Sequence, residues 1–351
     1  MIPGYDDIVE VYSDTRGLRF AVMGAEVFFW FDAPTMITID GAEHRRLRQP
    51  LAKYFTPAAM TRDWEPRVRQ VVDELLAPLA RQGGTFDLAD FTKIPVVIVA
   101  EMFGVPPEHH EDSRRWSNAI VSNIAFGNEE SDARREMEQA VVELKQYLAE
   151  EIERHRRDPR DDLLNVMLNI PSWTDAEIRS TAILLLIAGY DTTAKLMSNC
   201  LVALEQHPDQ RRLLVENPSL VPNAVEEVLR WAGAAQSIVR QVRQATVLAE
   251  TRLAPGDILY PLFVAGNRDP SRWEDPHRFD VRRPYQANLG FGTGPHICLG
   301  APLARLETKV AVEGLLRIAP EYHLRDLDYG DAFFARGPER GLIEAAVPVA
   351  T

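Results

Sequence analysis

The sequence predicts a mainly α fold with a minor β portion, arranged as a single domain over residues 1–351. Helical patterns of apolar residues fill most of residues 66–157. The capping-box pattern Thr174-Asp-Ala-Glu177 then predicts the start of a long helix that runs to Leu204. Residues 239–263 instead alternate between apolar and polar side chains and contain turn residues, which indicates short strands. Apolar residues make up 46% of the chain, which is enough to fill a sizeable core.

Shorter patterns predict further helices and surface positions. Residues 5–13 are expected to form a short helix. Asp40-Gly-Ala-Glu43 resembles a second capping box, so a helix should follow it. The heavily charged run 132–157 predicts a long helix on the surface. Three histidines in polar surroundings are expected at the surface: His109, His110 and His155.

Charge and composition exclude several classes of protein. The net charge of −13 argues against a nucleic-acid partner. Two cysteines, Cys200 and Cys298, cannot form a disulfide framework, so a reducing cytoplasm is the simplest location. The first residues show no basic segment followed by an apolar run, and the longest apolar run, 182–188, is too short to cross a membrane. We therefore expect a cytoplasmic monomer without a signal peptide or a membrane segment.

The loop Phe291-Gly-Thr-Gly-Pro-His-Ile-Cys-Leu-Gly300 carries the functional prediction. A helical pattern begins directly after it, and Pro302 suits a first helical turn. Cys298 therefore precedes a helix N-terminus, where backbone N–H groups and the helix dipole stabilise a thiolate. Zinc normally takes several protein ligands, whereas this loop offers one thiolate and no second cysteine nearby. A single thiolate suits a metal whose other ligands come from a macrocycle, which predicts haem.

The spacing Phe291-x-x-Gly294-x-His296-x-Cys298-Leu-Gly300 resembles the haem-ligand loop of cytochromes P-450 at every defining position. The resemblance implies a single haem-enclosing domain with haem b as cofactor and Cys298 as the iron ligand. It also implies that Phe291, Gly292 and Gly300 contact the haem. It extends from about Tyr5 to the end of the chain. By analogy with the family's typical domain size, about 40–50 residues, forming a helix and two strands, are expected before this point.

Two further motifs resemble haem-binding positions of the family. His44 and Arg48 are four residues apart, so they share one face of the helix expected after Asp40. Such a cationic face suits a carboxylate partner, and the resemblance implies a haem propionate. Arg240 aligns with the second propionate arginine of the family. With His296, these residues are expected to hold the two propionates.

The segment Ala188-Gly-Tyr-Asp-Thr-Thr193 lies within the predicted long helix. Apolar residues surround this helix on all sides, so Asp191 is energetically costly there unless it is paired or functional. Gly189 weakens the helix, and Thr192 can bond to a backbone carbonyl, which together permit a local bulge. The segment resembles the oxygen-binding segment of the family. The resemblance implies that Ala188 lies beside the haem and that Asp191 and Thr192 relay protons.

A structural motif and a substrate pocket complete the expected site. Glu227 and Arg230 form a Glu-x-x-Arg pair on one helical face, which resembles the buried pair of the family. That pair is completed by an arginine from a later loop, and Arg278 is the expected residue. Pocket-lining positions are expected at Leu184, Ile187, Gln236 and Val239.

The resemblance implies a haem-thiolate monooxygenase that inserts one oxygen atom of O2 into a small-to-medium apolar substrate. Electrons are expected from a ferredoxin and its reductase. Two enzymatic alternatives are a peroxide-driven reaction and a P-450-like coupling, dehydration or isomerisation. Peroxide-driven members of the family lose the acid–alcohol pair that Asp191 and Thr192 retain. A non-enzymatic haem-thiolate sensor is the alternative of another class, although no signalling domain is evident.

Overall fold

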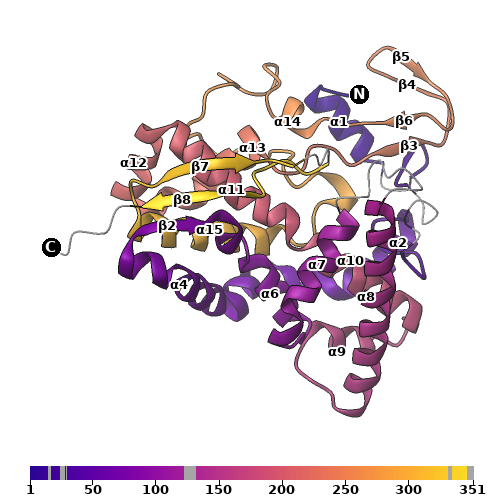
Figure 1. The fold of residues 1–351 in the computed structure, drawn as a ribbon. Helices are drawn as coiled ribbons and strands as arrows, with labels where there is room; N and C mark the ends of the chain where they lie inside the picture. Colours follow the sequence, from indigo (N-terminus) through magenta and orange to yellow (C-terminus); the bar gives the residue numbers. More distant parts are fainter. Residues whose placement is uncertain (15–16, 24–27, 29, 122–131, 331–333, 346–351) are drawn as a thin grey trace.

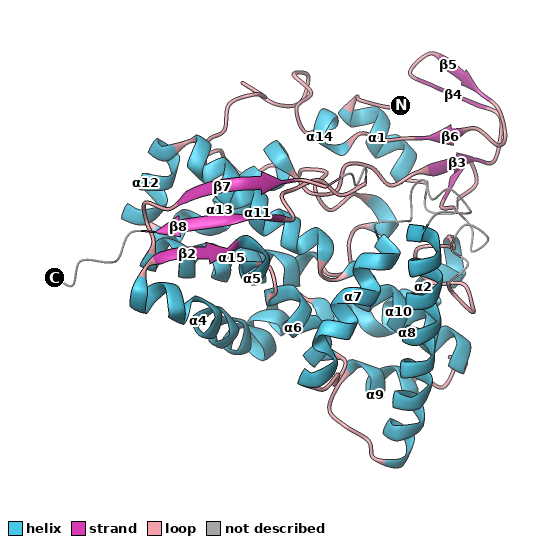
Figure 2. Ribbon diagram, in the orientation of Figure 1, coloured by secondary structure: helices cyan, strands magenta, loops and turns pink. Residues whose placement is uncertain are grey.

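The computed structural model of the protein describes residues 1–351 except 15–16, 24–27, 29, 122–131, 331–333 and 346–351. The described chain is mainly helical and has small antiparallel sheets, as predicted (Figures 1 and 2). The α-helices are α1 (Tyr5–Tyr12), α2 (Gly41–Ala52), α3 (Pro57–Ala59), α4 (Glu65–Gln82), α5 (Leu88–Phe91), α6 (Ile94–Met102), α7 (His110–Val121), α8 (Asp132–Arg157), α9 (Leu163–Leu168), α10 (Asp175–Ala188), α11 (Asp191–Gln206), α12 (Pro208–Glu216), α13 (Val221–Ala232), α14 (Phe263–Gly266) and α15 (Ala301–Ile318).

The strands form two sheets and a hairpin. In the first sheet, β3 (Arg240–Val242) lies between β1 (Phe20–Ala21) and β6 (Ile258–Leu259), with Arg240 opposite Leu259. In the second sheet, β8 (Arg340–Ala345) lies between β2 (Gly84–Asp87) and β7 (His323–Asp328). The hairpin joins β4 (Thr246–Leu248) and β5 (Thr251–Leu253). Figure 1 shows the first sheet beside α1 and the second sheet beside α11 and α13, on the other side of the view.

Two apolar clusters hold these elements together. The larger cluster lies among the helices and includes Ile183 and Leu186 of α10. The smaller cluster joins α1 to the first sheet through residues such as Ile8 and Phe20. Burial of such side chains supplies the main favourable term in folding. The two clusters fix α10, which carries Leu184, Ile187 and Ala188, and the first sheet, which carries Arg240.

The helix predictions are confirmed at most positions. α1 and α8 occupy the two ranges expected, and the strands β3 to β6 lie within residues 239–263. The Thr174 capping box is present, because its hydroxyl accepts from the Glu177 N–H while the Glu177 carboxylate accepts from the Thr174 N–H. The single long helix expected from this point is wrong, since Gly189 and Tyr190 separate α10 from α11. Among the described residues, no helix is both long enough and apolar enough to cross a membrane.

The capping box expected at Asp40 is also wrong. Asp40 is the residue before α2, but its carboxylate makes no capping hydrogen bond. One carboxylate oxygen instead accepts from the Val22 N–H at 3.0 Å, and the other lies 2.8 Å from Nε2 of His296. Contacts with distant segments therefore replace the local contact, and they tie the start of α2 to the cysteine loop.

Candidate active site

The cysteine loop closes on itself immediately before α15. The N–H of Cys298 donates to the Phe291 carbonyl at 3.0 Å. Gly292 and Gly294 have φ angles of 70° and 73°, which side-chain-bearing residues rarely adopt. A Cβ on Gly294 would lie 2.2 Å from the carbonyl oxygen of Tyr12. Glycine is therefore required for this turn and for its close contact with the end of α1.

The Cys298 side chain is accessible, in contrast to the buried Cys200. Desolvation by the protein around the thiol raises its pKa, while the N–H groups of Gly300 and Ala301 and the charges of Arg48 and Arg305 lower it. Desolvation is the largest of these effects, so the pKa of the free thiol remains raised. A metal cation bound to this sulfur would stabilise the thiolate against that penalty.

α2 lies against the cysteine loop through the face that carries His44 and Arg48. The rings of His44 and His296 are 4.2 Å apart, and the Arg48 guanidinium donates to the Ile297 carbonyl at 2.5 Å. His44 is buried, and its Nε2 has no hydrogen-bond partner among the described residues. Burial and then the neighbouring His296 ring lower the pKa of His44 to about 4. This imidazole is thus a buried polar group that a further acceptor or donor would satisfy.

Arg240 reaches the same cluster from β3. Its side chain is buried, and the guanidinium lies 4.1 Å from the ring centre of Tyr12. Its Nη1 donates to the Val239 carbonyl at 3.0 Å, and it makes no ion pair with a carboxylate in the described part of the chain. The Tyr12 hydroxyl donates to the Ile238 carbonyl, which fixes the ring under the guanidinium. Burial lowers the pKa of Arg240, as expected for a desolvated cation without a close anion.

Packing at the junction of α10 and α11 explains the helix break. A Cβ on Gly189 would lie 2.8 Å from Val99 of α6 and 2.9 Å from the Leu185 carbonyl. The buried Tyr190 turns its hydroxyl to the carbonyls of Ser113 and Arg114 at α7. These contacts hold the chain out of helical register between the two helices.

Asp191 and Thr192 lie directly after this break, at the start of α11. The Thr192 hydroxyl is 3.4 Å from the Ala188 carbonyl, which it approaches as donor. Thr192 and Ala188 are both exposed, although most of α10 and α11 is buried. Asp191 is half-buried and accepts from Nζ of Lys195 at 3.0 Å. Desolvation raises the pKa of the Asp191 carboxyl, and Lys195 only partly offsets it.

The four expected pocket residues differ in exposure. Leu184 and Ile187 belong to the buried apolar core, whereas Gln236 and Val239 are half-buried. The Gln236 amide nitrogen donates to the Gly233 and Ala234 carbonyls at 2.9 and 3.2 Å. The Gln236 side-chain N–H groups therefore stabilise their own turn.

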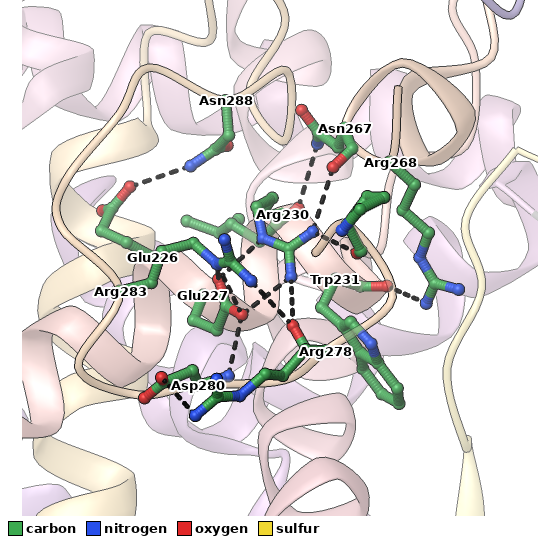
Figure 3. A network of polar contacts seen from close by, with 12 residues as sticks. Glu226, Glu227, Arg230, Trp231, Asn267, Arg268, Arg278, Asp280, Arg283 and Asn288 are labelled. Atoms are coloured by element: carbon green, nitrogen blue, oxygen red, sulfur yellow. Dashed lines mark hydrogen bonds and ion pairs between the residues drawn. The ribbon is translucent and has the colours of Figure 1, made fainter. Parts of the chain in front are cut away.

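The Glu227–Arg230 pair forms as predicted and is almost completely buried. Two parallel bonds of 2.7 and 2.8 Å join the groups, and Arg230 also donates to the carbonyls of Asn267, Pro276 and Arg278 (Figure 3). The expectation that Arg278 completes the pair is wrong. Its side chain is 58% exposed and pairs with Asp280, and Arg283 instead lies 3.2 Å from Glu227.

The surface position expected for His155 is wrong as well. The ring is buried between α8 and the start of α9, with Nε2 2.8 Å from Asp162 and Nδ1 2.8 Å from the Glu151 carbonyl. Asp162 also caps α9 by accepting from the Asn165 N–H. His155 therefore links two helices. His109 and His110 are only partly buried.

Residues 5–318 match the sequence profile of the family described as cytochrome P450. The chain belongs to the cytochrome P450 family. It is 34% identical to cytochrome P450 CYP107DY1 of Priestia megaterium, covering 91% of this chain and 82% of that protein. It is 35% identical to the vitamin D(3) 25-hydroxylase of Pseudonocardia autotrophica, covering 88% and 77% of the two chains.

Solved structures agree with this assignment. The crystal structure of CYP109E1 from Bacillus megaterium in complex with testosterone is 31% identical to this chain. The match has a TM-score of 0.89 and covers 98% of this chain and 91% of the other. This protein is thus a cytochrome P450 monooxygenase by family and fold, and cytochromes P450 use haem.

The residues of this P450 fit a haem group. The accessible Cys298 thiol is a ligand for iron, and haem carries two carboxylates that need cationic or hydrogen-bonding partners. Arg240 and His44 are buried with unmet capacity to bind such groups, and Arg48 lies beside the cysteine loop. Contacts through Tyr12, Gly294 and His296 join these residues into one cluster.

Sequence reasoning did not find several members of this site. Asp40 and Tyr12 support His296 and Arg240, Arg283 completes the Glu227 pair, and Lys195 pairs with Asp191. Only Lys195 had a local signal, because it lies four residues after Asp191 on the same helix. The other three reach their partners across distant segments.

Proposed function

We propose that this cytochrome P450 binds haem b through Cys298 and inserts one oxygen atom of O2 into an apolar organic substrate. The observation that supports this most directly is the accessible Cys298 thiol next to the N–H groups of Gly300 and Ala301. Haem, when bound, supplies the iron at which O2 is reduced with electrons from a donor protein. Phe291, Gly292 and Gly300, in the loop that carries the Cys298 sulfur, would contact the haem.

The cationic cluster orients the cofactor. Arg48 and Arg240 carry permanent charges, and His44 and His296 provide ring nitrogens for the propionates. Asp40 holds the His296 ring through Nε2, so that ring is fixed before a propionate arrives. Ala188 offers a small, exposed side chain that leaves space beside the cofactor.

Thr192 and Asp191 supply the protons that O2 reduction consumes. The Thr192 Oγ1 holds a proton in its bond to the Ala188 carbonyl and can pass it on. The half-buried carboxyl of Asp191 replaces that proton, because its raised pKa favours the acid form. Retention of both residues favours O2 with a reductant over peroxide as the oxidant.

The substrate is proposed to be small to medium in size and mainly apolar. Leu184, Ile187 and Val239 are apolar, and Gln236 has no N–H group to spare for a ligand. The named relatives are consistent with this class, since one is a vitamin D(3) 25-hydroxylase and one neighbour structure holds testosterone. A site of this composition selects its ligand mainly by shape. Electrons are proposed to come from a ferredoxin and its reductase.

Isotope incorporation tests this function. Apolar compounds are first screened for a shift of the Soret band, and those that bind are incubated with a ferredoxin, its reductase and ¹⁸O2. A monooxygenase yields product with one ¹⁸O atom and consumes reductant in proportion. Product without ¹⁸O would instead identify a coupling or dehydration reaction. Binding without any turnover would favour a haem-thiolate sensor.

A further inference from the structure

We propose that Lys195 and Glu339 determine how readily Asp191 takes up a proton, with Glu339 as the solvent-facing member of the three. This inference rests on the proposed role of Asp191 in proton supply. It assigns a positioning function to two residues outside the motifs described above. Both act through Asp191.

The three side chains form one chain of ion pairs. Nζ of Lys195 lies 3.0 Å from Oδ2 of Asp191 and 3.0 Å from Oε1 of Glu339. The Lys195 side chain is only 3% exposed, whereas Asp191 is 16% and Glu339 is 39% exposed. Exposure therefore rises from the buried ammonium through Asp191 to Glu339, and Glu339 has the largest contact with water.

Close packing of residues 336–339 against α11 places Glu339 beside Lys195. A Cβ on Gly337 would lie 2.9 Å from Cβ of Lys195, and a Cβ on Gly330 would lie within 3.0 Å of the Glu339 carboxylate. Gly330 also has a φ of 59°, which favours glycine. Asn199, one turn after Lys195, donates to the Arg336 carbonyl at 2.9 Å. Side chains at either glycine would displace the carboxylate or the lysine.

The charges in this group do not balance. One ammonium between two carboxylates leaves one net negative charge, so the group can accept one proton and become neutral. That proton goes to Asp191, because Asp191 is less exposed than Glu339 and desolvation therefore destabilises its ionised form more. Among the remaining titratable groups nearby, Tyr190 has a pKa raised by desolvation, and Arg114 is paired with Glu111.

Lys195 and Glu339 act on Asp191 in opposite directions. Lys195 alone would hold Asp191 as a carboxylate, because an adjacent cation favours the ionised form. Glu339 shares the ammonium and adds a second negative charge, which restores the tendency of Asp191 to accept a proton. Desolvation has the largest effect on Asp191 and raises its pKa. Lys195 lowers that pKa, and Glu339 raises it. The shared lysine thus keeps Asp191 paired in both protonation states.

Infrared titration of the ferric holoenzyme tests this assignment without turnover. The carbonyl stretch of protonated carboxyl groups is followed against pH, and the band lost in Asp191→Asn is assigned to Asp191. Glu339→Gln should move the midpoint of that band to lower pH by about 1 unit, and Lys195→Met should move it to higher pH by about 1 unit or more. Glu344→Gln, on β8 and paired with Arg325, is the matched control and should leave the midpoint unchanged.

The outcomes separate this inference from the proposed function. An unchanged midpoint in Glu339→Gln, or shifts of the same sign in both variants, overturns the inference. Glu339 is exposed enough that its variant should fold even if Lys195→Met does not. In turnover, the Glu339→Gln enzyme should show its best product yield per reductant at lower pH than the wild type. Wild-type yields in Asp191→Asn would refute the proton supply of the proposed function, whereas the infrared midpoints would still decide the inference.

Discussion

The guanidinium of Arg283 lies 3.2 Å from the carboxylate of Glu227, a residue 56 positions earlier in the chain. Glu227 is 2% exposed and also binds Arg230, so one buried carboxylate neutralises two guanidinium groups only in part. Arg283 donates in addition to the carbonyls of Glu274 and Asp275. This arrangement fastens the segment before the cysteine loop to α13.

Removal of Arg283 should therefore destabilise the fold. Arg283→Ala is expected to lower the free energy of unfolding by about 3 kcal/mol, because it removes one of the two cations beside the buried Glu227 carboxylate and leaves Arg230 and the Asp280 N–H as partners. The matched change Arg278→Ala should cost less than about 1 kcal/mol, since the Arg278 side chain is exposed and its pair with Asp280 is screened. Urea unfolding of the two variants measures the difference. Equal losses in both variants would contradict the assignment of Arg283.

Cys298 should control the spectrum of the haem complex. Cys298→Ser is expected to abolish the red-shifted carbon-monoxide band that thiolate ligation produces, because a serine hydroxyl is a poor substitute for the sulfur. Cys200→Ser is the control, since Cys200 is buried within the core. It should keep the band, even if the buried hydroxyl lowers stability. A normal band in the Cys298 variant would disprove its role as ligand.

Arg240 should contribute to haem retention. Arg240→Ala removes a buried cation proposed to bind a propionate, so the variant should lose haem at least about 10-fold faster to an apo-globin acceptor. Arg243→Ala, three residues later and exposed, should retain haem as the wild type does. The rate is read from the absorbance of the acceptor. Identical rates in all three proteins would mean that Arg240 does not hold the cofactor.

Thr192 and Asp191 should affect the outcome of O2 reduction more than O2 binding. Thr192→Ala is expected to consume reductant but to release most of it as hydrogen peroxide. Asp191→Asn should slow turnover by about 10²-fold, the lower end of the contribution of a positioned proton donor. Product and peroxide per reductant consumed are the quantities to measure.

The neighbouring threonine provides the control for that experiment. The Thr193 hydroxyl is buried and donates to the Gly189 carbonyl at 3.2 Å. Thr193→Ala should therefore keep the wild-type product yield, although it can lower stability. Wild-type yields in both the Thr192 and Asp191 variants would remove the proton supply from the mechanism.

Arg45 should assist electron delivery by an acidic ferredoxin. Three other basic residues of α2 and α15 are already paired, Arg46 with Glu177, Arg305 with Glu226 and Lys309 with Glu65. Arg45 is exposed on α2 next to His44. Arg45→Glu should slow reduction several-fold at low salt, and the difference should shrink as salt increases.

Stopped-flow reduction measures this effect. Arg157→Glu, at the far end of α8, changes the net charge equally and is the control. It should leave the rate of reduction close to that of the wild type. Equal slowing by the two variants would indicate an effect of total charge, and no local docking role for Arg45.

The sequence by itself determined the features that depend on neighbouring residues. The glycines around Cys298 permit the turn, and the helix after it supplies the free N–H groups that face the sulfur. The Thr174 capping box and the Glu227–Arg230 pair follow from spacings of three residues along a helix. Short-range geometry of this kind is fixed by the backbone, so it can be predicted without knowledge of the packing.

The tertiary structure decided which distant side chains meet. Asp40 contacts His296, 256 residues later, and does not cap its own helix. Arg283, and not Arg278 as expected, pairs with Glu227. Glu339 reached Lys195 because the C-terminal segment packs on α11. By charge alone, other carboxylates could have paired with His296 or Lys195, and other arginines with Glu227. Only the packing of elements far apart in the chain brought one of them within hydrogen-bonding distance of its partner.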